Sequence, residues 1–155
     1  MLRRALLALV LVLVSIVGAA PALTAAADAK PRLSAGQRIV KLAKSYVGKA
    51  RYVEGGASPK TGFDCSGFTR YIYRRAHVRR LPHNAEAQRH VKHMRRIPRA
   101  KARPGDLVFY LSGGRAYHVA IYAGHGMQYA AATERDGIRH QHIWSHQVEF
   151  RTLTH

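Results

Sequence analysis

Apolar residues recur every three to four positions over the early part of the chain, which predicts helices. Ser34 and Gln37 form a capping-box pattern at the start of the first such run, and Gly48 follows its end. The periodic positions in this run are Ile39, Val40, Leu42, Ala43, Tyr46 and Val47. The pattern therefore predicts a helix over residues 34–47.

Two further helical segments are predicted between residues 64 and 94. Asp64 is a suitable N-cap for the first of them, after a glycine-rich loop over residues 54–62. Asn84 is a suitable N-cap for the second, which we expect to reach about residue 94. The positions that share one face of the helix after Asp64 are Phe68, Ile72 and Ala76.

The apolar pattern changes from a helical to a strand period after the turn at residues 104–106. The predicted strands cover residues 107–111, 117–123, 127–132 and 137–143. Short connections between successive strands favour an antiparallel meander. Helices followed by a sheet indicate the α+β class, with N-terminal helices packed on an antiparallel sheet.

The segment from Met1 to Ala29 has the pattern of a secretory signal peptide: a positive start, a short apolar run and small residues. The apolar run covers residues 5–17 and is shorter than the roughly 20 residues that a membrane-spanning helix needs. The candidate cleavage points follow Ala22, Ala27 and Ala29. We therefore expect removal of residues 1–29, no transmembrane segment after cleavage, and one secreted domain over residues 30–155. The alternative is a retained membrane anchor.

The 155-residue chain is strongly basic, with 26 Lys and Arg against 8 Asp and Glu, a formal net charge of +18. Removal of residues 1–29 leaves 24 basic and 7 acidic residues, so a charge of +17 belongs to the exported part. Such a charge indicates an anionic partner, which by composition alone is a nucleic acid, a membrane surface or an acidic polymer. Export makes a nucleic acid the least natural of the three.

Cys65 is the single cysteine, so no disulfide forms within the chain. A lone cysteine in an exported protein is a buried core residue, half of an intermolecular disulfide, or a reactive thiol. Cys65 follows Asp64 and falls in the first turn of the predicted helix, where free N–H groups and the helix dipole stabilise a thiolate. Gly67 leaves space beside it for a substrate backbone. This position favours the reactive thiol.

His118 differs from most of the ten histidines because it lies in an apolar strand. It shares a predicted strand face with Ala120 and Tyr122, whereas most other histidines have basic or polar neighbours. A histidine on a sheet that faces a helix N-terminus can take the proton of a thiol nucleophile. The alternative is a histidine that only fills the core or the sheet edge.

The remaining histidines do not predict a metal site. Those with suggestive spacing are His90 and His93, and His140, His142 and His146. No cluster of thiolates or carboxylates accompanies them, and structural zinc sites usually combine such ligands with histidine. We expect neither a metal nor another cofactor.

Three sequence blocks resemble the NlpC/P60 family, which are papain-like cysteine peptidases of bacterial cell walls. The blocks are Phe63-Asp64-Cys65-Ser66-Gly67-Phe68, Arg103-Pro104-Gly105-Asp106-Leu107-Val108-Phe109 and His118-Val119-Ala120-Ile121-Tyr122-Ala123-Gly124. The segment Tyr52-Val53-Glu54-Gly55-Gly56 is similar to the tyrosine-containing loop that precedes the cysteine in the family. The resemblance runs from about residue 33 to residue 150.

The resemblance implies the papain-like NlpC/P60 fold, with a cysteine-bearing helix packed on a histidine-bearing antiparallel sheet. It implies that Cys65 is the nucleophile and His118 the general base and acid. It also implies that Tyr52 lines the site and that Asp64 and Ser66 shape the substrate pocket.

The function implied by the resemblance is that of a secreted cysteine endopeptidase of the cell wall. Its substrates would be peptidoglycan stem peptides, cut at an amide next to a γ-linked D-glutamate and a diamino acid. We expect a monomer that anionic wall polymers retain by charge, with no specific nucleic-acid partner.

The sequence departs from the family pattern at the third catalytic position, a polar residue on the next strand. That position falls at Ala130, whose methyl group cannot orient an imidazole. Gln128 shares its strand face and is our candidate replacement, and His140 and His142 are further candidates. Glu54 stands where an aromatic residue commonly precedes the paired glycines. These departures leave open a peptidoglycan-binding protein of the same fold with weak or no catalysis.

Overall fold

The structure is a computed structural model that describes residues 32–155, so the signal peptide expected over residues 1–29 lies outside the described residues. The helical elements are α1 (Ala35–Ser45), α2 (Cys65–Arg75), α3 (Ala85–Arg89) and the short 3₁₀-helix η1 (Arg99–Lys101). The strands are β1 (Ala57–Ser58), β2 (Gly62–Phe63), β3 (Arg95–Ile97), β4 (Leu107–Ser112), β5 (Arg115–Gly124), β6 (Met127–Ala131), β7 (Ile138–His142) and β8 (Val148–Thr152). In this part of the chain, no helix combines the length and apolar character needed to cross a membrane.

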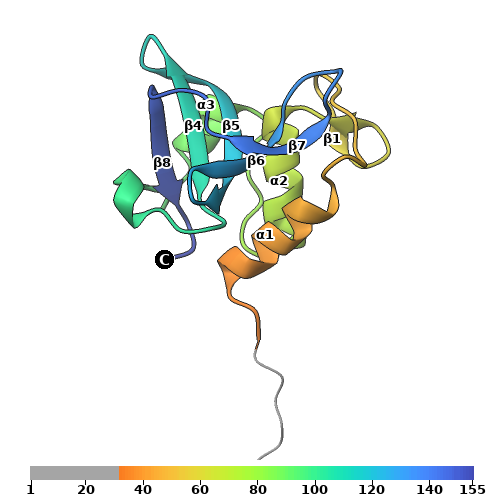
Figure 1. Cartoon of the computed structure of the whole chain (residues 1–155). Coiled ribbons are helices and arrows are strands. Elements are labelled where there is room, and N and C mark those ends of the chain that lie inside the picture. The colour runs from red at the N-terminus through yellow and green to blue at the C-terminus, as the bar shows by residue number, and fades with distance from the viewer. Residues whose placement is uncertain (1–31) are drawn as a thin grey trace, which may run out of the picture. The chain divides into compact units, whose positions relative to one another are not determined.

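Six strands form one antiparallel sheet in the order β3-β8-β4-β5-β6-β7 (Figure 1). Strands β4 to β7 are neighbours in chain order, which confirms the predicted meander. The short strands β1 and β2 pair separately and lead into α2. Helices α1 and α2 lie beside one another against the sheet, as the α+β prediction requires (Figure 1).

Both predicted caps are present at the two long helices. The Ser34 hydroxyl accepts a hydrogen bond from the Gln37 backbone N–H at 3.2 Å, and the Gln37 side chain accepts from the Ser34 N–H at 2.8 Å. Asp64 caps α2 through the N–H of Gly67. The two reciprocal bonds at Ser34 satisfy helix-terminal donors that have no partner within the helix.

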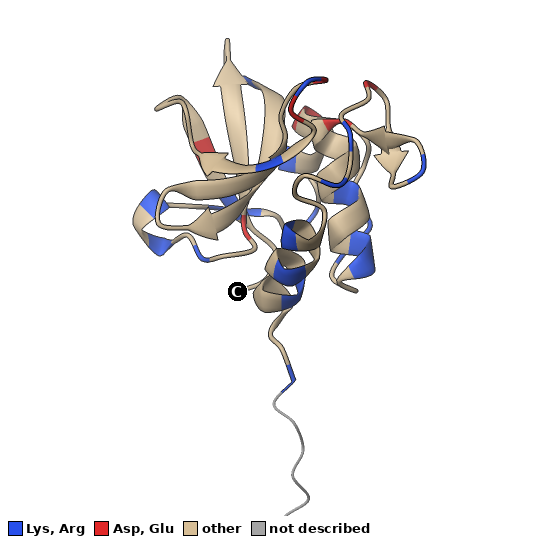
Figure 2. Ribbon diagram, turned by 45° about the vertical axis from the view of Figure 1, so that its right-hand side comes forward, with Lys and Arg blue, Asp and Glu red and all other residues tan. Residues whose placement is uncertain are grey.

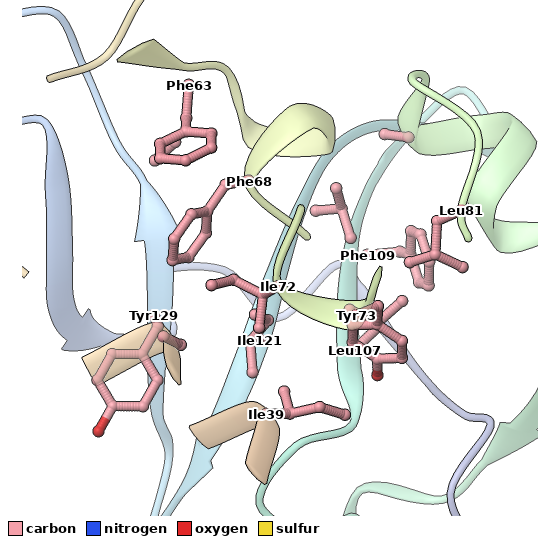
Figure 3. Packing of buried hydrophobic residues seen from close by; sticks show 14 of the residues in the cluster. Ile39, Phe63, Phe68, Ile72, Tyr73, Leu81, Leu107, Phe109, Ile121 and Tyr129 are labelled. Carbon is pink, nitrogen blue, oxygen red and sulfur yellow. The ribbon is translucent and has the colours of Figure 1, made fainter. Parts of the chain in front are cut away.

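The main core lies between α1, α2 and one face of the sheet (Figure 3). Its largest members are Ile39, Phe63, Phe68, Ile72, Tyr73, Leu81, Leu107, Phe109, Ile121 and Tyr129. A second, smaller cluster lies on the other face and contains Val108, Tyr110, Tyr122 and Phe150. The prediction that neighbouring positions of β5 alternate between two faces is therefore confirmed, because Ile121 belongs to one cluster and Tyr122 to the other.

The third helix is shorter than predicted, since α3 ends at Arg89 rather than near residue 94. His93 adopts a φ of +70°, a left-handed conformation that interrupts a helix. The chain then extends into β3, which pairs with β8. The residues between α3 and β3 form turns, so the helix does not continue up to the strand.

Strand β8 was not predicted, although it lies in the interior of the sheet between β3 and β4. Its Phe150 packs in the smaller cluster, but the neighbouring Glu149 is also buried. Glu149 is paired with Arg89 of α3 at 3.1 Å and with Arg151. A buried charge surrounded by basic partners hides the apolar alternation that usually identifies a strand.

Helix α1 approaches the sheet through a contact between two glycines. A Cβ added at Gly36 would lie closer to the Pro104 carbonyl oxygen than the 3.0 Å that real Cβ atoms keep. Gly105 has a φ of +100°, and a Cβ there would meet the Gly36 backbone equally closely. The turn that begins β4 therefore rests directly on the first turn of α1.

Gly36→Ala is expected to destabilise the fold by about 1–3 kcal/mol, because the added methyl group overpacks the backbone contact. The sign of the change in unfolding free energy is informative, since alanine in place of glycine in a helix ordinarily stabilises a protein by about 0.5–1 kcal/mol. Urea unfolding measures the change, and Lys41→Ala at an exposed position of α1 is the control, with an expected change within about 0.5 kcal/mol. A Gly36→Ala protein more stable than the wild type would contradict the close contact.

Candidate active site

The carboxylate of Asp64 organises the start of α2. One oxygen accepts hydrogen bonds from the Gly67 N–H at 2.6 Å and from the Ser66 hydroxyl at 3.0 Å. The other accepts from the Gly55 N–H at 3.0 Å and lies 2.7 Å from Nε2 of His83. Asp64 thus joins the helix that carries the thiol to the glycine-rich loop and to the segment before α3.

The space beside Gly67 is filled by the chain itself, which corrects our expectation that a substrate backbone approaches there. A Cβ at Gly67 would collide with the Gly56 carbonyl oxygen and would lie 2.9 Å from Nε2 of His83. Gly67 is therefore required for packing of the preceding loop against α2. The sequence pattern identified the glycine but not which backbone approaches it.

Gln88 of α3 also holds the first turn of α2 in place, through hydrogen bonds that do not involve Asp64. This fully buried side chain donates to the Ser66 carbonyl and to the Pro82 carbonyl, both at 2.8 Å. Its own oxygen accepts from the Thr69 hydroxyl at 2.8 Å. A buried amide with all of these partners satisfied restricts movement of the helix start and of the segment that carries His83.

A cavity of about 500 Å³ opens in front of this helix start. The residues that line it are Tyr52, Glu54, Asp64, Cys65, Ser66, His83, Asn84, Ala85, Ala116, Tyr117, His118, Ala132 and Trp144. Five of our sequence candidates, including Cys65 and His118, are therefore brought to one cavity. Gln128 and Ala130 are not among its lining residues.

A β-bulge lies immediately before His118. On β5, Ala116 is opposite Leu111 and His118 is opposite Tyr110, so Tyr117 is an extra residue without a partner on β4. A bulge increases the local twist and redirects neighbouring side chains, and bulges are frequent beside active sites. Here the bulged segment borders the cavity that also holds Cys65.

The thiol of Cys65 is held in its protonated form. Burial raises its pKa most, and the carboxylates of Asp64 and Glu54 raise it further. The backbone N–H groups of Val119 and Ser66 lower the pKa, but they do not offset the burial. The helix terminus alone suggested a stabilised thiolate, so the folded environment reverses that expectation for the free protein.

The imidazole of His118 is held in its neutral form. Burial lowers its pKa from 6.5 to about 4. Its Nε2 atom is buried and has no hydrogen-bond partner in the structure described for residues 32–155. At neutral pH the cavity therefore contains a neutral thiol and a neutral imidazole, and Nδ1 is the ring nitrogen left to face the cavity.

None of the candidates for the third position binds the buried nitrogen of His118. Gln128 lies on the predicted face, but its oxygen accepts from the Tyr110 hydroxyl at 2.9 Å and its amide nitrogen has no partner within the described range. His140 stacks on Tyr129, which belongs to the core on the opposite face of the sheet. His142 follows His140 by two residues on β7, so both side chains lie on the same face of the sheet. Gln128 as a direct partner of the imidazole is therefore not supported by its contacts.

Tyr52 and Glu54 form a pair at the rim of the cavity. The tyrosine hydroxyl donates to a Glu54 carboxylate oxygen at 2.5 Å, and this bond is the main cause of a raised pKa for Tyr52. The position at which the sequence departs from the aromatic pattern thus supplies a carboxylate that holds the tyrosine. The pairing brings a negative charge close to the thiol.

The model of the NlpC/P60 family matches residues 48–154, which is more than half of the chain. The chain belongs to the NlpC/P60 family. The match includes every cavity residue named above, from Tyr52 to Trp144.

Curated proteins and a solved structure that resemble the chain support this assignment. Murein DD-endopeptidase MepH of Escherichia coli is 43% identical over 77 residues, which cover 48% of this chain and 28% of MepH. The gamma-DL-glutamyl hydrolase of Bacillus subtilis is 40% identical over 88 residues, which cover 57% of this chain and 20% of the hydrolase. The crystal structure of the NlpC/P60 domain of the peptidoglycan hydrolase SagA superimposes with a TM-score of 0.65 and 35% identity, covering 76% of this chain and 97% of that domain. The chain spans about a quarter of the length of these curated relatives.

The contacts of two residues that line this cavity were not predicted from the sequence. His83 follows Leu81-Pro82 and lies in a loop with no periodic pattern, so only its contact with Asp64 identifies it. Trp144 lies between β7 and β8, far from the thiol along the chain, and is 51% exposed. Neither residue carries a local signal, because folding alone places both beside Cys65.

Cys65 is expected to react slowly with iodoacetamide at pH 7 in the folded protein and faster once the chain is unfolded in urea. The folded environment raises the thiol pKa, and unfolding returns it to the ordinary range near 8.5. Because Cys65 is the single cysteine, mass spectrometry of the whole protein reports the reaction directly.

The thiolate absorbance in the ultraviolet, followed against pH and corrected with Cys65→Ser, separates the pKa from steric access. Full thiolate absorbance in the folded protein at pH 6 would refute the neutral thiol.

Proposed function

We propose that the chain is a cysteine endopeptidase that hydrolyses amide bonds in peptidoglycan stem peptides. The observation that carries the proposal is the joint presence of Cys65, at the N-terminus of α2, and His118, on β5, in one cavity. The names of the relatives, a murein endopeptidase and a glutamyl hydrolase, support the substrate class. Cys65 is the proposed nucleophile and His118 the proposed general base and acid.

The reaction begins from the neutral pair. His118 takes the thiol proton on Nδ1 as sulfur attacks the scissile carbonyl carbon, and the carbonyl oxygen becomes an oxyanion. The Cys65 backbone N–H at the helix terminus is placed to stabilise that oxyanion. The intermediate collapses when His118 returns the proton to the departing amine. Water then attacks the thioester with His118 again as base, which releases the acid product and the thiol.

The cavity lining suits a short, polar peptide. Asp64 and Ser66 bind each other and the helix start, so they shape the pocket rather than offer free groups. Glu54 and His83 line the same cavity, with Glu54 paired to Tyr52 and His83 paired to Asp64. We propose that the cut amide lies next to a γ-linked D-glutamate, in line with the name of the Bacillus subtilis relative.

Cys65→Ala is expected to abolish release of soluble peptides from purified peptidoglycan, a loss of at least about 10³-fold. His118→Gln should cause a comparable loss, whereas His140→Ala, on an exposed strand position away from the cavity, should retain activity. Mass spectrometry of the released peptides identifies the bond, and products cut only between two D-amino acids would refute the γ-glutamyl assignment. Undiminished activity of Cys65→Ala would refute the nucleophile.

The second candidate function is a peptidoglycan-binding protein with weak or no catalysis. Ala130 and the unpartnered Nε2 of His118 favour it, because no polar group among the described residues orients the imidazole. This candidate predicts that the wild-type protein sediments with peptidoglycan yet releases no peptide. Peptide release that depends on Cys65 would exclude it.

We also propose that the chain acts outside the membrane, retained by anionic wall polymers. Lys and Arg are spread over α1, α2 and η1, and acidic residues are few (Figure 2). Charges on several faces favour diffuse attraction to a polyanion over recognition at one site. The expected signal peptide over residues 1–29 supports export.

The proposed retention should depend on salt, because attraction between exposed charges is screened within about 3 Å at 1 M salt. The protein should appear in the wall fraction of its cells, cleaved after Ala22, Ala27 or Ala29, and high salt should elute it. Replacing the exposed Arg99, Lys101 and Arg103 by glutamine should lower the eluting salt concentration. Exchanging Arg and Lys for one another at these positions is the charge-matched control. Retention unaffected by salt would contradict the proposal.

A further inference from the structure

Two aromatic rings flank the imidazole of His118. Tyr110 is its direct neighbour on β4, with ring centroids 5.3 Å apart and planes at 71°. Trp144 approaches from the connection between β7 and β8, with ring centroids 5.1 Å apart and planes at 53°. Trp144 also stacks on Tyr110 at 4.1 Å and 19°. The three rings form one cluster at the edge of the cavity.

The Tyr110 ring is held in place by a buried hydrogen bond. Tyr110 and Gln128 are both fully buried, and the tyrosine hydroxyl donates to the Gln128 oxygen at 2.9 Å. Burial is the main cause that raises the pKa of Tyr110 to about 12, so the hydroxyl stays protonated and keeps this bond. Gln128 therefore acts on the cluster through Tyr110 and not through His118.

His118 lacks a polar partner at the atom where an orienting group is needed. Its Nε2 is buried without a hydrogen bond among the described residues, and the methyl group of Ala130 offers no acceptor. An N–H group can donate weakly to an aromatic face, and a cation within about 6 Å of a ring centroid is attracted by the ring quadrupole. Both aromatic neighbours of His118 lie within that distance.

We propose that Trp144 and Tyr110 are positioning residues that replace the missing polar group with aromatic faces. They favour the tautomer with hydrogen on Nε2, which leaves Nδ1 free to take the thiol proton. They also stabilise the imidazolium that exists between proton uptake from Cys65 and proton release to the leaving amine. The catalytic consequence rests on the proposed function, whereas the effect on the imidazole does not.

The aromatic cover acts against the desolvation of the imidazolium. Burial lowers the pKa of His118 because the charged imidazolium loses its hydration. The ring faces attract the cation and so offset part of this loss. The other titratable groups at the same cavity are Tyr52, Glu54, Asp64, Cys65, His83 and Tyr117. A ring that only excluded water would have the opposite effect, since its removal would hydrate the imidazolium and raise the His118 pKa.

The composition of the chain allows a test that leaves its shape unchanged. Trp144 is the single tryptophan, so growth on fluorinated tryptophans modifies this ring alone. Each added fluorine weakens the negative potential of the ring face with little change in size. We expect kcat for peptide release to fall stepwise along the series, by about tenfold in total, with KM unchanged. A flat series in correctly folded protein would overturn the proposal.

Two substitutions separate the ring face from the cover it provides. Trp144→Phe keeps an aromatic face and should retain most of kcat, whereas Trp144→Leu keeps an apolar cover without that face and should lose about tenfold. Leu33→Ala, at another exposed hydrophobic position, is the control and should match the wild type. Equal activities of Trp144→Phe and Trp144→Leu would overturn the proposal.

A second measurement does not depend on catalysis. In the Cys65→Ala background, NMR titration gives the His118 pKa, with the resonance assigned by its loss in His118→Gln. The proposal predicts that this pKa falls as Trp144 is fluorinated, even if the chain hydrolyses nothing. A falling pKa without peptidase activity would refute the proposed function alone. An unchanged or rising pKa would refute the aromatic positioning, whatever the activity.

Discussion

The buried carboxylate of Asp64 joins the three segments that surround the thiol. Its two oxygens have partners in the first turn of α2, in the glycine-rich loop at Gly55 and at His83. Hydrogen bonds to a charged acceptor are stronger than neutral ones, and losing any of them would leave a buried charge incompletely paired. These bonds hold together the segments that line the cavity in front of Cys65.

The sequence predicts those parts of the fold that local signals specify. Ser34 and Asp64 cap helices as expected, and the β4–β7 meander follows from short turns between alternating strands. The elements that the sequence did not predict depend on pairing between distant segments. Strand β8 was missed because its buried Glu149 is neutralised by Arg89, and β3 was missed because its pairing with β8 is not visible locally.

The candidate site likewise has parts that local sequence signals predict and parts that depend on the folded chain. The cavity brings together Cys65 and His118, which the sequence marked by a cap and an apolar strand. The surroundings of these groups were not predictable, because burial is a property of the folded chain. Burial decides that the thiol keeps its proton and that His118 is neutral. For the same reason the sequence showed that Ala130 lacks a donor but could not show that Trp144 reaches the imidazole.

Two carboxylates lie beside the thiol of a chain that is strongly basic as a whole. Basic residues lie over the helices and η1, whereas two of the eight acidic residues, Glu54 and Asp64, line the cavity. Both carboxylates raise the thiol pKa, which opposes any lowering of that pKa by the basic surface. Attraction to a polyanion and the acid–base state of the site are thus governed by separate groups of residues.

The bulge on β5 means that the orientation of the imidazole depends on the number of residues in the strand rather than on their side chains. Tyr117 is the additional residue, and its 58% exposed side chain lines the cavity, with its ring centroid 6.3 Å from that of Tyr110 on β4. Substitution at this position leaves the backbone count, and so the direction of His118, intact. Point mutation at residue 117 can therefore alter the rim of the cavity, whereas deletion of the residue would change the orientation of His118.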